Sequence, residues 1–296
     1  MKVDWSPLVG KTVMVTGSTG LIGSHLRTSV QKIATHCYFP ARGALLGGEL
    51  LPKVDYVIHA AGYGVPALFM KSPIETIQVN TETVISLMKC LKSNGSFLFC
   101  STSEIYKGFH GIPSENDIGA TNPQHPRSAY IEGKRCGEAI MKAYRDGGIQ
   151  AKVARINLVY GPGTKVHDGR VLNQLIEQAL TTGKIQPRDN CSCTPTYCYI
   201  DDMVEMLWNV LLHGTQEVYN LAGIDTLPLS NLAKLIGKLT GAEVIIPKEP
   251  VSAPFVTMDT TRYRREFKKR DFVTLRQGMS KTIEYQRGLY DTRIAS

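Results

Sequence analysis

Short runs of apolar, often β-branched residues alternate with longer segments of helical apolar spacing along the first half of the chain. The short runs predict buried strands, and the longer segments predict helices. Helices are expected from the turn after the first strand to about residue 33, at 74–93 and at 126–147. Strands are expected at residues 12–16, 36–39, 54–62, 96–103 and 150–161. This alternation is typical of an α/β, Rossmann-type fold with a doubly wound parallel sheet.

In the second half of the chain the apolar pattern is looser. Helices are predicted near residues 169–182, 201–212 and 229–240, with a loop rich in Cys, Thr and Pro after the first of them. We therefore expect a smaller mixed lobe that mainly binds substrate. The expected boundaries are 1–160 for the Rossmann domain and 161–296 for this lobe, with 201–222 returning to the first domain.

The connection between the second and third predicted strands is short. Only residues 40–54 lead from one strand into the next. A crossover alone takes at least roughly 10–12 residues, so a helix, a further strand and a second connection hardly fit. The sheet is expected to lack one outer strand.

The sequence TGSTGLIG joins the first predicted strand to the first predicted helix. Its glycines allow a tight turn, bring backbone N–H groups close to a pyrophosphate, and let the helix pack closely on the strand. In this context the loop predicts dinucleotide binding, supported by the HAAG that ends a later strand. The residues assigned to the cofactor are Gly17, Gly20, Leu21, Ile22, Gly23, Ala60, Ala61 and Gly62.

The adenosine side of this site is less regular. Dinucleotide-binding proteins usually carry an Asp or Glu about 20 residues further on, where it holds the ribose 2′-hydroxyl. Here that region reads HCYFPARG and has no acidic residue. Arg42 is either a partner for the 2′-phosphate of NADP or a surface arginine. NAD is the expected cofactor, and NADP is the alternative.

The stretch PRSAYIEGKR places Tyr130 and Lys134 four positions apart. On a helix this spacing puts both side chains on one face. A free phenol, with a pKa of about 10, is a poor base at neutral pH, but a nearby ammonium favours the phenolate. The pair therefore predicts a base that deprotonates a hydroxyl during hydride transfer.

These motifs resemble the extended short-chain dehydrogenase/reductases, specifically the NAD-dependent epimerase/dehydratases that act on nucleotide sugars. The resemblance runs from TGSTGLIGSHL through STSEIY, YIEGK and YGPG to LRQGMSKTIEYQ. It implies a catalytic set of Thr102, Tyr130 and Lys134, in which Thr102 orients the substrate hydroxyl and Lys134 also holds the nicotinamide ribose. It further implies a homodimer formed through the helices at 74–93 and 126–147.

Within this family, TSEIY, PRSAYIEGKR and DGRVLNQLIEQAL are most similar to UDP-glucuronate decarboxylases. Such enzymes oxidise the sugar C4 hydroxyl with bound NAD, lose carbon dioxide and then reduce the C4 ketone. The similarity implies that Glu104 positions or protonates the reacting sugar, although a structural hydrogen bond at a strand end is the alternative. The residues that it assigns to the substrate are Ser103, Asn157, Arg170 and Gln174.

The chain departs from these relatives on the substrate side. Where they carry an arginine in a QxRxFxYVxD-like stretch, this chain reads CTPTYCYIDD with Pro195. Where they have the asparagine of RxxNxYGP, this chain has Leu158, with Asn157 one position earlier. A substrate other than UDP-glucuronate is therefore an open alternative.

Other activities would use the same catalytic set. A nucleotide-sugar 4-epimerase, a 4,6-dehydratase and an NADPH ketoreductase are alternatives inside the enzyme class. A dehydratase usually has an Asp-Glu pair after the threonine, where this chain has Ser103 and Glu104. A non-catalytic dinucleotide sensor or scaffold is the alternative from another class, and the complete Tyr-Lys pair argues against it.

Composition adds little to this interpretation. The net charge of +8 comes substantially from RYRREFKKR at 262–270, which we interpret as a solvated helix face and not as a nucleic-acid site. The seven cysteines, including Cys191, Cys193 and Cys198, predict reduced thiols without a metal. No apolar run approaches the roughly 18 residues of a membrane span, and no signal-peptide pattern is present, so we expect a cytoplasmic protein without a membrane partner.

Overall fold

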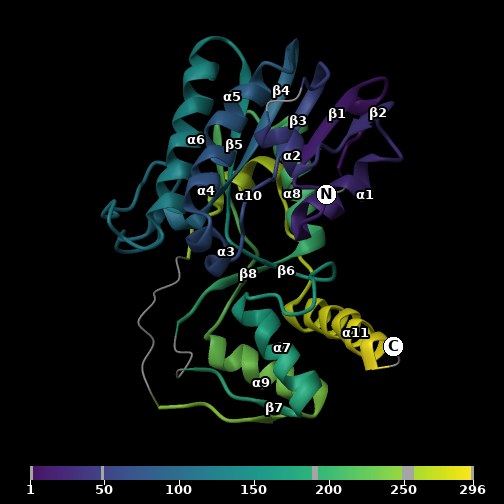
Figure 1. Cartoon of the computed structure of the whole chain (residues 1–296), viewed down its shortest axis with the longest axis vertical. Coiled ribbons are helices and arrows are strands. Elements are labelled where there is room, and N and C mark those ends of the chain that lie inside the picture. The colour runs from purple at the N-terminus through teal and green to yellow at the C-terminus, as the bar shows by residue number, and fades with distance from the viewer. Residues whose placement is uncertain (1–2, 48–49, 189–192, 249–256, 295–296) are drawn as a thin grey trace.

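The computed structural model describes residues 3–47, 50–188, 193–248 and 257–294. At its centre lies a six-stranded sheet in which all neighbouring strands are parallel (Figure 1). The strand order is β2 (His36–Tyr38), β1 (Thr12–Thr16), β3 (Val54–His59), β4 (Leu91–Thr102), β5 (Gln150–Ile156) and β9 (Val218–Leu221). The inner strands have apolar sequences because helices cover both faces of the sheet.

Helices on the two faces bury two separate cores. Alternate side chains of β1 show this directly, because Val13 and Val15 enter one core and Met14 enters the other. The first core is covered by α1 (Leu21–Val30) and α8 (Ile200–His213), and the second by α4 (Pro73–Asn80), α5 (Glu82–Met88) and α6 (Ser128–Asp146). This arrangement confirms the predicted doubly wound α/β fold.

In the described part of the chain, the large sheet ends at β2, without the further outer strand whose absence the sequence predicted. Between β2 and β3, the described residues form one short helix, α2 (Arg42–Leu46), and no strand. Three further short helices are η1 (Ser6–Leu8) before β1, α3 (Pro66–Lys71) after β3, and η2 (Ser103–Tyr106) after β4. The last two lie at the carboxyl edge of the sheet, where a ligand site is expected.

Three elements differ from the predicted ones. The strand expected at 150–161 is divided into Gln150–Ile156 of the large sheet and Leu158–Tyr160, which pairs in the second lobe. The helix expected at 74–93 is divided at Thr81, whose backbone leaves the helical region (φ −125°, ψ −78°) and whose hydroxyl donates to the carbonyl of Ile77. The strand expected from residue 96 already begins at Leu91, because an irregular pairing with β3 adds residues at its start.

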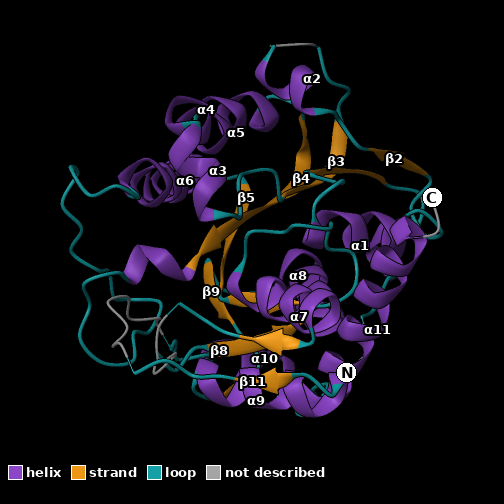
Figure 2. Cartoon of the chain, turned by 60° about the horizontal axis from the view of Figure 1, so that its bottom comes forward, coloured by secondary structure: helices purple, strands orange, loops and turns teal. Residues whose placement is uncertain are grey.

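The second lobe lies beside the carboxyl edge of the large sheet (Figure 2). It contains the strands β6 (Leu158–Tyr160), β8 (Thr196–Tyr199) and β10 (Asp225–Thr226), and the pair β7 (Lys184–Ile185) and β11 (Glu243–Val244). Its helices are α7 (Val171–Thr182), α9 (Leu229–Thr240) and α11 (Leu275–Ile294). The chain returns to the large sheet through α8 and β9, and again through α10 (Thr261–Phe267), which packs on β9.

The basic segment 262–270 forms α10 and the turn that follows it. Lys269 is only 3% exposed, and its ammonium lies 2.9 Å from Asp202 Oδ1 and 3.1 Å from Glu205 Oε2. Arg262 donates to a backbone carbonyl of β9 at 2.8 Å. The interpretation as a solvated helix face is therefore wrong for these two cations, which fasten the segment to α8 and β9.

Replacing Lys269 with Met is expected to destabilise the protein by about 3–5 kcal/mol, because two carboxylates lose their buried counter-charge. Urea denaturation followed by circular dichroism measures this free energy of unfolding. Arg270→Met removes an exposed cation from the same segment and is expected to change it by less than about 0.5 kcal/mol. Equal effects of the two substitutions would contradict the buried ion pairs.

Candidate active site

The glycine loop between β1 and α1 is closely packed against the end of β3. Gly17 has a φ of +69°, and a Cβ there would lie 2.6 Å from the carbonyl oxygen of Ala60. A Cβ on Gly23 would lie 2.0 Å from the carbonyl oxygen of Gly17. Only glycine fits at these two positions, as the fingerprint predicted.

The same region fits a dinucleotide. Gly20 is the N-cap of α1 and gives the helix no side-chain cap, so the first-turn N–H groups have no side-chain acceptor. Such a helix end suits a pyrophosphate. Gly17, Gly20, Leu21 and Gly23 would contact the cofactor through the backbone, and the cofactor roles of all the assigned loop residues stay predictions.

A buried histidine fixes the loop to its neighbours. His59 at the end of β3 is fully buried, and its Nε2 donates to the carbonyl of Val79 at 2.8 Å. Its Nδ1 therefore accepts the hydroxyl of Thr16 at 2.8 Å, and that hydroxyl oxygen accepts the N–H of Ala61 at 3.2 Å. Burial lowers the pKa of His59 to about 3, so the ring is neutral. The His of HAAG was the signal for this contact, which the sequence analysis did not use.

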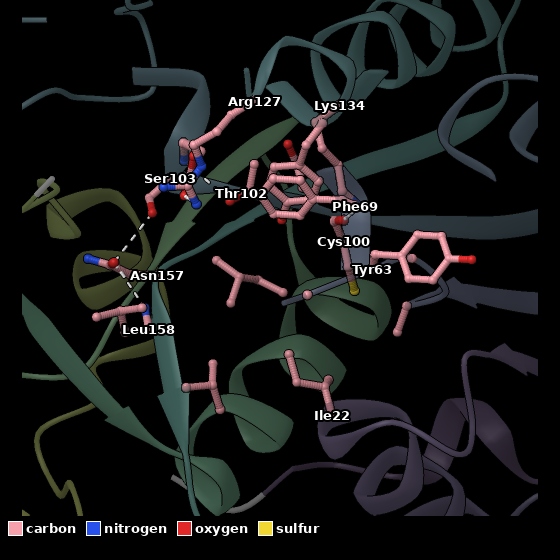
Figure 3. Close-up of a pocket in the computed structure, with 18 of the residues that line it drawn as sticks. Ile22, Tyr63, Phe69, Cys100, Thr102, Ser103, Arg127, Lys134, Asn157 and Leu158 are labelled. Atoms are coloured by element: carbon pink, nitrogen blue, oxygen red, sulfur yellow. Dashed lines mark hydrogen bonds and ion pairs between the residues drawn. The ribbon is translucent and has the colours of Figure 1, made fainter. Parts of the chain in front are cut away.

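A cavity of about 250 Å³ lies between the glycine loop, the carboxyl ends of the central strands and the second lobe (Figure 3). The predicted residues that line it are Ile22, Ala60, Ala61, Gly62, Thr102, Ser103, Glu104, Tyr130, Lys134, Asn157 and Arg170. Lining residues that the sequence analysis missed include Tyr63, Phe69, Lys107 and Arg127. Most of the candidate residues thus surround one cavity.

Tyr130 and Thr102 lie together in this cavity. Tyr130 comes from the first turn of α6 and Thr102 from the last residue of β4, and their hydroxyls are hydrogen-bonded. Burial raises the pKa of Tyr130 to about 12, and the hydrogen bond from Thr102 opposes this rise. The geometry suits a phenol and a hydroxyl that share one substrate oxygen.

Lys134 lies on the same face of α6, but its ammonium is directed to the backbone. It donates to the carbonyl of Cys100 at 2.6 Å and lies 4.7 Å from the ring centre of Phe99. Burial lowers the pKa of Lys134 to about 8. Lys134 is not among the groups that shift the pKa of Tyr130, which is raised and not lowered in the chain alone. A lowering of the phenol pKa by this ammonium together with the positive nicotinamide ring stays a prediction.

Glu104 is paired with a residue that the sequence analysis missed. Its Oε1 forms a short ion pair with Nη2 of Arg127, which directly precedes α6. Burial raises the pKa of Glu104, whereas the cations of Arg127 and Lys107 oppose this rise. The arginine of PRSAY was the available signal, but a partner 23 positions away leaves no local pattern.

Ser103 and Asn157 meet on the side of the cavity nearest the second lobe. The Ser103 hydroxyl donates to Asn157 Oδ1 at 3.3 Å, and the same oxygen accepts the N–H of Leu158 at 2.9 Å. Figure 3 shows these residues facing Ile22 across the cavity. Asn157 thus reaches the cavity although it stands one position before the family's asparagine.

Arg170 lines the cavity from the start of α7 and is held by Asp168, with Nη2–Oδ2 at 2.6 Å and Nε–Oδ1 at 2.8 Å. The ion pair lowers the pKa of Asp168 against the opposing effect of burial. Gln174 lies one turn further along the helix, is exposed and does not line this cavity. A substrate role for either residue stays a prediction.

Arg42 lies near the expected adenosine side, at the start of α2. Its guanidinium is 4.4 Å from the ring centre of Tyr63, and its Nη1 donates to the Tyr63 hydroxyl at 2.6 Å. Tyr63 in turn donates to Glu75 at 2.5 Å. Arg42 is exposed, so both a cofactor phosphate partner and a surface arginine are consistent with this geometry.

The second-lobe segment around Pro195 is only partly described. Pro195 is buried and does not line the cavity, and Cys198 is buried in β8. Cys191 lies outside the described residues. In the part of the chain that the structure describes, no group of three or more His, Cys, Asp or Glu side chains is placed to hold a metal, and no helix has the length and apolar composition to cross a membrane.

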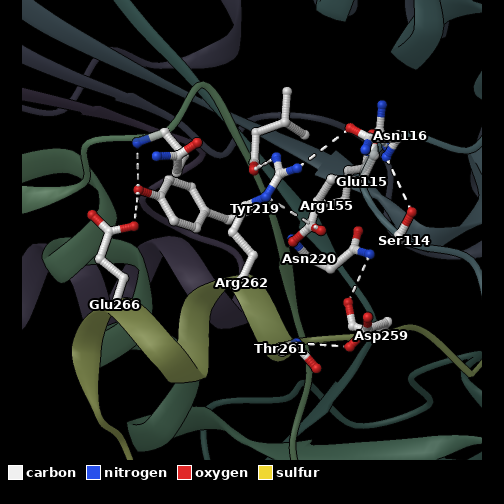
Figure 4. Close-up of polar contacts among 12 residues, drawn as sticks. Ser114, Glu115, Asn116, Arg155, Tyr219, Asn220, Asp259, Thr261, Arg262 and Glu266 are labelled. Carbon is white, nitrogen blue, oxygen red and sulfur yellow. Dashed lines mark hydrogen bonds and ion pairs between the residues drawn. The ribbon is translucent and has the colours of Figure 1, made fainter.

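A buried polar network holds the long segment between η2 and α6 against the sheet (Figure 4). Arg155 of β5 pairs with Glu138 of α6 at 2.7 Å and donates to the carbonyl of Glu115 at 2.9 Å. The backbone N–H of Asn220 in β9 donates to the Glu115 carboxylate at 2.9 Å. This segment ends at Arg127, so the network also fixes one wall of the cavity.

The fold and cavity are those of a dinucleotide-dependent α/β enzyme. A sequence model of the NAD dependent epimerase/dehydratase family matches residues 46–222, more than half of the chain. The protein belongs to this family. The match begins after the glycine loop, whose assignment therefore rests on its sequence and on the crowded glycines.

Individual proteins are similar to this chain in sequence or in structure. UDP-glucuronic acid decarboxylase 1 of Danio rerio is 28% identical over 306 residues, which cover 93% of this chain and 72% of that protein. An epimerase structure from Methanothermobacter thermautotrophicus has a TM-score of 0.86 at 19% identity and covers 99% of this chain and 96% of its own. The UDP-glucuronic acid 4-epimerase of Bacillus cereus, solved with UDP-glucuronic acid and NAD, has a TM-score of 0.77 at 21% identity and covers 94% and 100%. These two structures confirm the fold.

Gly23→Ala is expected to weaken NAD binding by at least about tenfold, or about 1.4 kcal/mol, because its Cβ would push the carbonyl of Gly17 out of the loop. Isothermal titration calorimetry measures the affinity. Gly288→Ala in α11, where a Cβ would have nothing within 4 Å, is the matched control. If both variants bind NAD as the wild type does, the loop is not the cofactor site.

Proposed function

We propose that the protein oxidises the C4 hydroxyl of a nucleotide sugar transiently with NAD, and that it decarboxylates UDP-glucuronate. The observation that carries this proposal is the grouping of Thr102, Tyr130, Lys134 and Glu104 around one cavity beside the glycine loop. Family membership supports the reaction class. Similarity to UDP-glucuronic acid decarboxylases supports the substrate.

In this reaction Tyr130 takes the proton of the sugar C4 hydroxyl, which the Thr102 hydroxyl orients. NAD held at the glycine loop would supply the hydride acceptor for C4 and, once the C4 ketone has allowed the neighbouring carboxylate to leave as carbon dioxide, the hydride donor. Lys134 holds the nicotinamide ribose from α6, beside the end of β4. Glu104 positions the sugar or supplies the proton to the carbon that carried the carboxylate.

Charge in the cavity favours an anionic substrate. Lys107, Arg127, Lys134 and Arg170 line it, and Glu104 is the one carboxylate among the described lining residues. Such an excess of cations attracts a sugar that carries a carboxylate and a diphosphate. Since Pro195 stands where relatives have an arginine, Lys107 and Arg170 are the cations proposed to bind the two anions.

Mass spectrometry of the protein with NAD and a panel of nucleotide sugars tests the proposal. UDP-glucuronate is expected to lose the mass of carbon dioxide without added reductant. Tyr130→Phe removes the proposed base and is expected to slow this conversion by about 10²–10⁴-fold. Tyr285 lies on α11 and does not line the cavity, so Tyr285→Phe serves as the control.

Other outcomes of that experiment point to other functions. Loss of water from a sugar indicates a 4,6-dehydratase, and an isomer of unchanged mass indicates a 4-epimerase. Stoichiometric consumption of NADPH with a keto sugar indicates a ketoreductase. If dinucleotide binds but no sugar is changed, a non-catalytic sensor or scaffold replaces the enzyme proposal.

We also propose that the protein is a cytoplasmic homodimer formed through α4, α5 and α6. Ile74, Ile77 and Ile85 are 68%, 41% and 38% exposed on α4 and α5. Apolar side chains exposed together on neighbouring helices favour association with another surface. A second copy of the same helices offers a matching surface in a two-fold dimer.

Sedimentation velocity is expected to give a species of twice the chain mass of 32.6 kDa. Ile77→Asp places a charge in the proposed interface and is expected to yield monomers. Ile224→Asp changes an apolar side chain that is 52% exposed in the turn between β9 and β10 and is expected to leave the dimer intact. Wild-type protein that sediments only as a monomer would rule out the dimer.

A further inference from the structure

Two side chains without catalytic chemistry join two proposed catalytic groups along one wall of the cavity. Glu104 pairs with Arg127, whose guanidinium carbon lies 5.3 Å from the ring centre of Phe69. The Phe69 ring stacks on Tyr130, with 4.5 Å between ring centres and 7° between planes. Figure 3 shows Arg127 and Phe69 on this wall of the cavity. The four residues form a continuous row, which we call the Arg127 row.

The Arg127 row connects parts of the chain that are distant in sequence. Phe69 comes from the short helix α3, Glu104 from η2, and Arg127 and Tyr130 from the start of α6. A guanidinium over an aromatic ring gains from both charge and stacking, and two stacked rings restrict each other's orientation. The row therefore restricts the orientation of the Tyr130 ring.

The ion pair leaves one carboxylate oxygen unused. Glu104 Oε2 is buried and has no hydrogen-bond partner among the described residues, and the same holds for Arg127 Nε. A buried carboxylate oxygen without a donor is unfavourable unless a ligand supplies one. Since Glu104 lines the cavity, a bound substrate whose hydroxyl reached Oε2 would supply the missing donor.

Arg127 lowers the pKa of both Glu104 and Tyr130, the two residues at the ends of the row. Glu104 faces the cations of Arg127 and Lys107, which lower its pKa, and the neutral phenol of Tyr130. Tyr130 faces Thr102, Glu104 and Arg127, of which Glu104 raises its pKa and Arg127 lowers it. Without Arg127, the anionic form of each group would become less favourable.

We propose that Arg127 is a positioning residue of this site. It holds Glu104 as a carboxylate with Oε2 available to the substrate, and through Phe69 it fixes the ring of Tyr130. The expected effect of Arg127 on turnover rests on the function proposed above, whereas its expected effect on the ionisation of Glu104 does not.

The ionisation of Glu104 is measured without turnover by carbon-13 NMR of protein labelled at the glutamate carboxyl carbon. The Glu104 signal is assigned from its absence in Glu104→Gln. Arg127→Gln is expected to raise the titration midpoint of Glu104 by about one pH unit, a tenfold change in acid dissociation. Arg127→Lys keeps a cation and is expected to raise it less. Lys142→Gln, which removes an exposed cation on the same helix, is expected to leave the midpoint unchanged.

The pH profile of kcat/KM, which reports groups of the free enzyme, gives the second measurement. Because the carboxylate is lost as pH falls through the Glu104 pKa, a raised pKa moves the acidic limb of the profile to higher pH. In Arg127→Gln this limb is expected to shift by the same amount as the NMR midpoint. Phe69→Leu is expected to lower kcat about tenfold with little change in KM, and Phe69→Tyr to restore it. If Arg127 and Phe69 had only a structural role, their substitution would lower the rate by the same factor at every pH.

An unchanged Glu104 midpoint in Arg127→Gln would overturn the proposal, whether or not any nucleotide sugar is converted. Should Arg127→Gln not fold, an unchanged midpoint in Arg127→Lys together with an unchanged kcat in Phe69→Leu would overturn it. A raised midpoint in a protein that converts no nucleotide sugar would support the positioning of Glu104 and refute the proposed function.

Discussion

The arrangement of the site depends on a buried positive charge. Lys134 is 5% exposed, and its ammonium donates to the carbonyl of Cys100 and lies over the ring of Phe99. A buried ammonium needs such acceptors, because burial otherwise favours its neutral form. These two contacts hold the start of α6 against the end of β4. They thereby bring Tyr130 close to Thr102. The nearby His59 is neutral, so no second cation competes with Lys134.

Local sequence patterns predicted the features of this site that depend on local geometry. Periodicity gave the alternating strands and helices, and the short segment after β2 predicted the absent outer strand. Gly17 and Gly23 were recognised because only glycine tolerates the backbone contacts at these positions. The spacing of Tyr130 and Lys134 placed both on one face of α6, next to the same cavity.

Partners brought together by tertiary packing could not be predicted in this way. Arg127 meets Glu104 across 23 positions and Lys269 meets Asp202 across 67, and neither pair leaves a periodic signal. The direction of the Lys134 ammonium was also hidden, because helical spacing fixes a face and not a hydrogen-bond acceptor. The basic segment was misinterpreted for a related reason: composition reports charge and not burial.

The proposed site has two sides. The side toward the glycine loop carries the expected dinucleotide residues, and the side toward the second lobe departs from the relatives. Near the glycine loop, Gly17 and Gly23 are crowded by backbone, as a dinucleotide fingerprint requires. Toward the second lobe, Pro195 takes the place of an arginine, and the wall instead carries Lys107, Arg127 and Arg170. A substrate with more than one anionic group fits such a wall, which is why we favour a uronate over a neutral sugar. The central claim is that this protein oxidises C4 only transiently and returns the same hydride to it.

Conversion of UDP-glucuronate deuterated at C4, followed by NMR and mass spectrometry without added reductant, tests this claim most directly. The account predicts a decarboxylated product that keeps its deuterium at C4 and gains one solvent hydrogen at the carbon that carried the carboxylate. A product that has lost the C4 deuterium to free cofactor or solvent, or a substrate recovered unchanged, would contradict it.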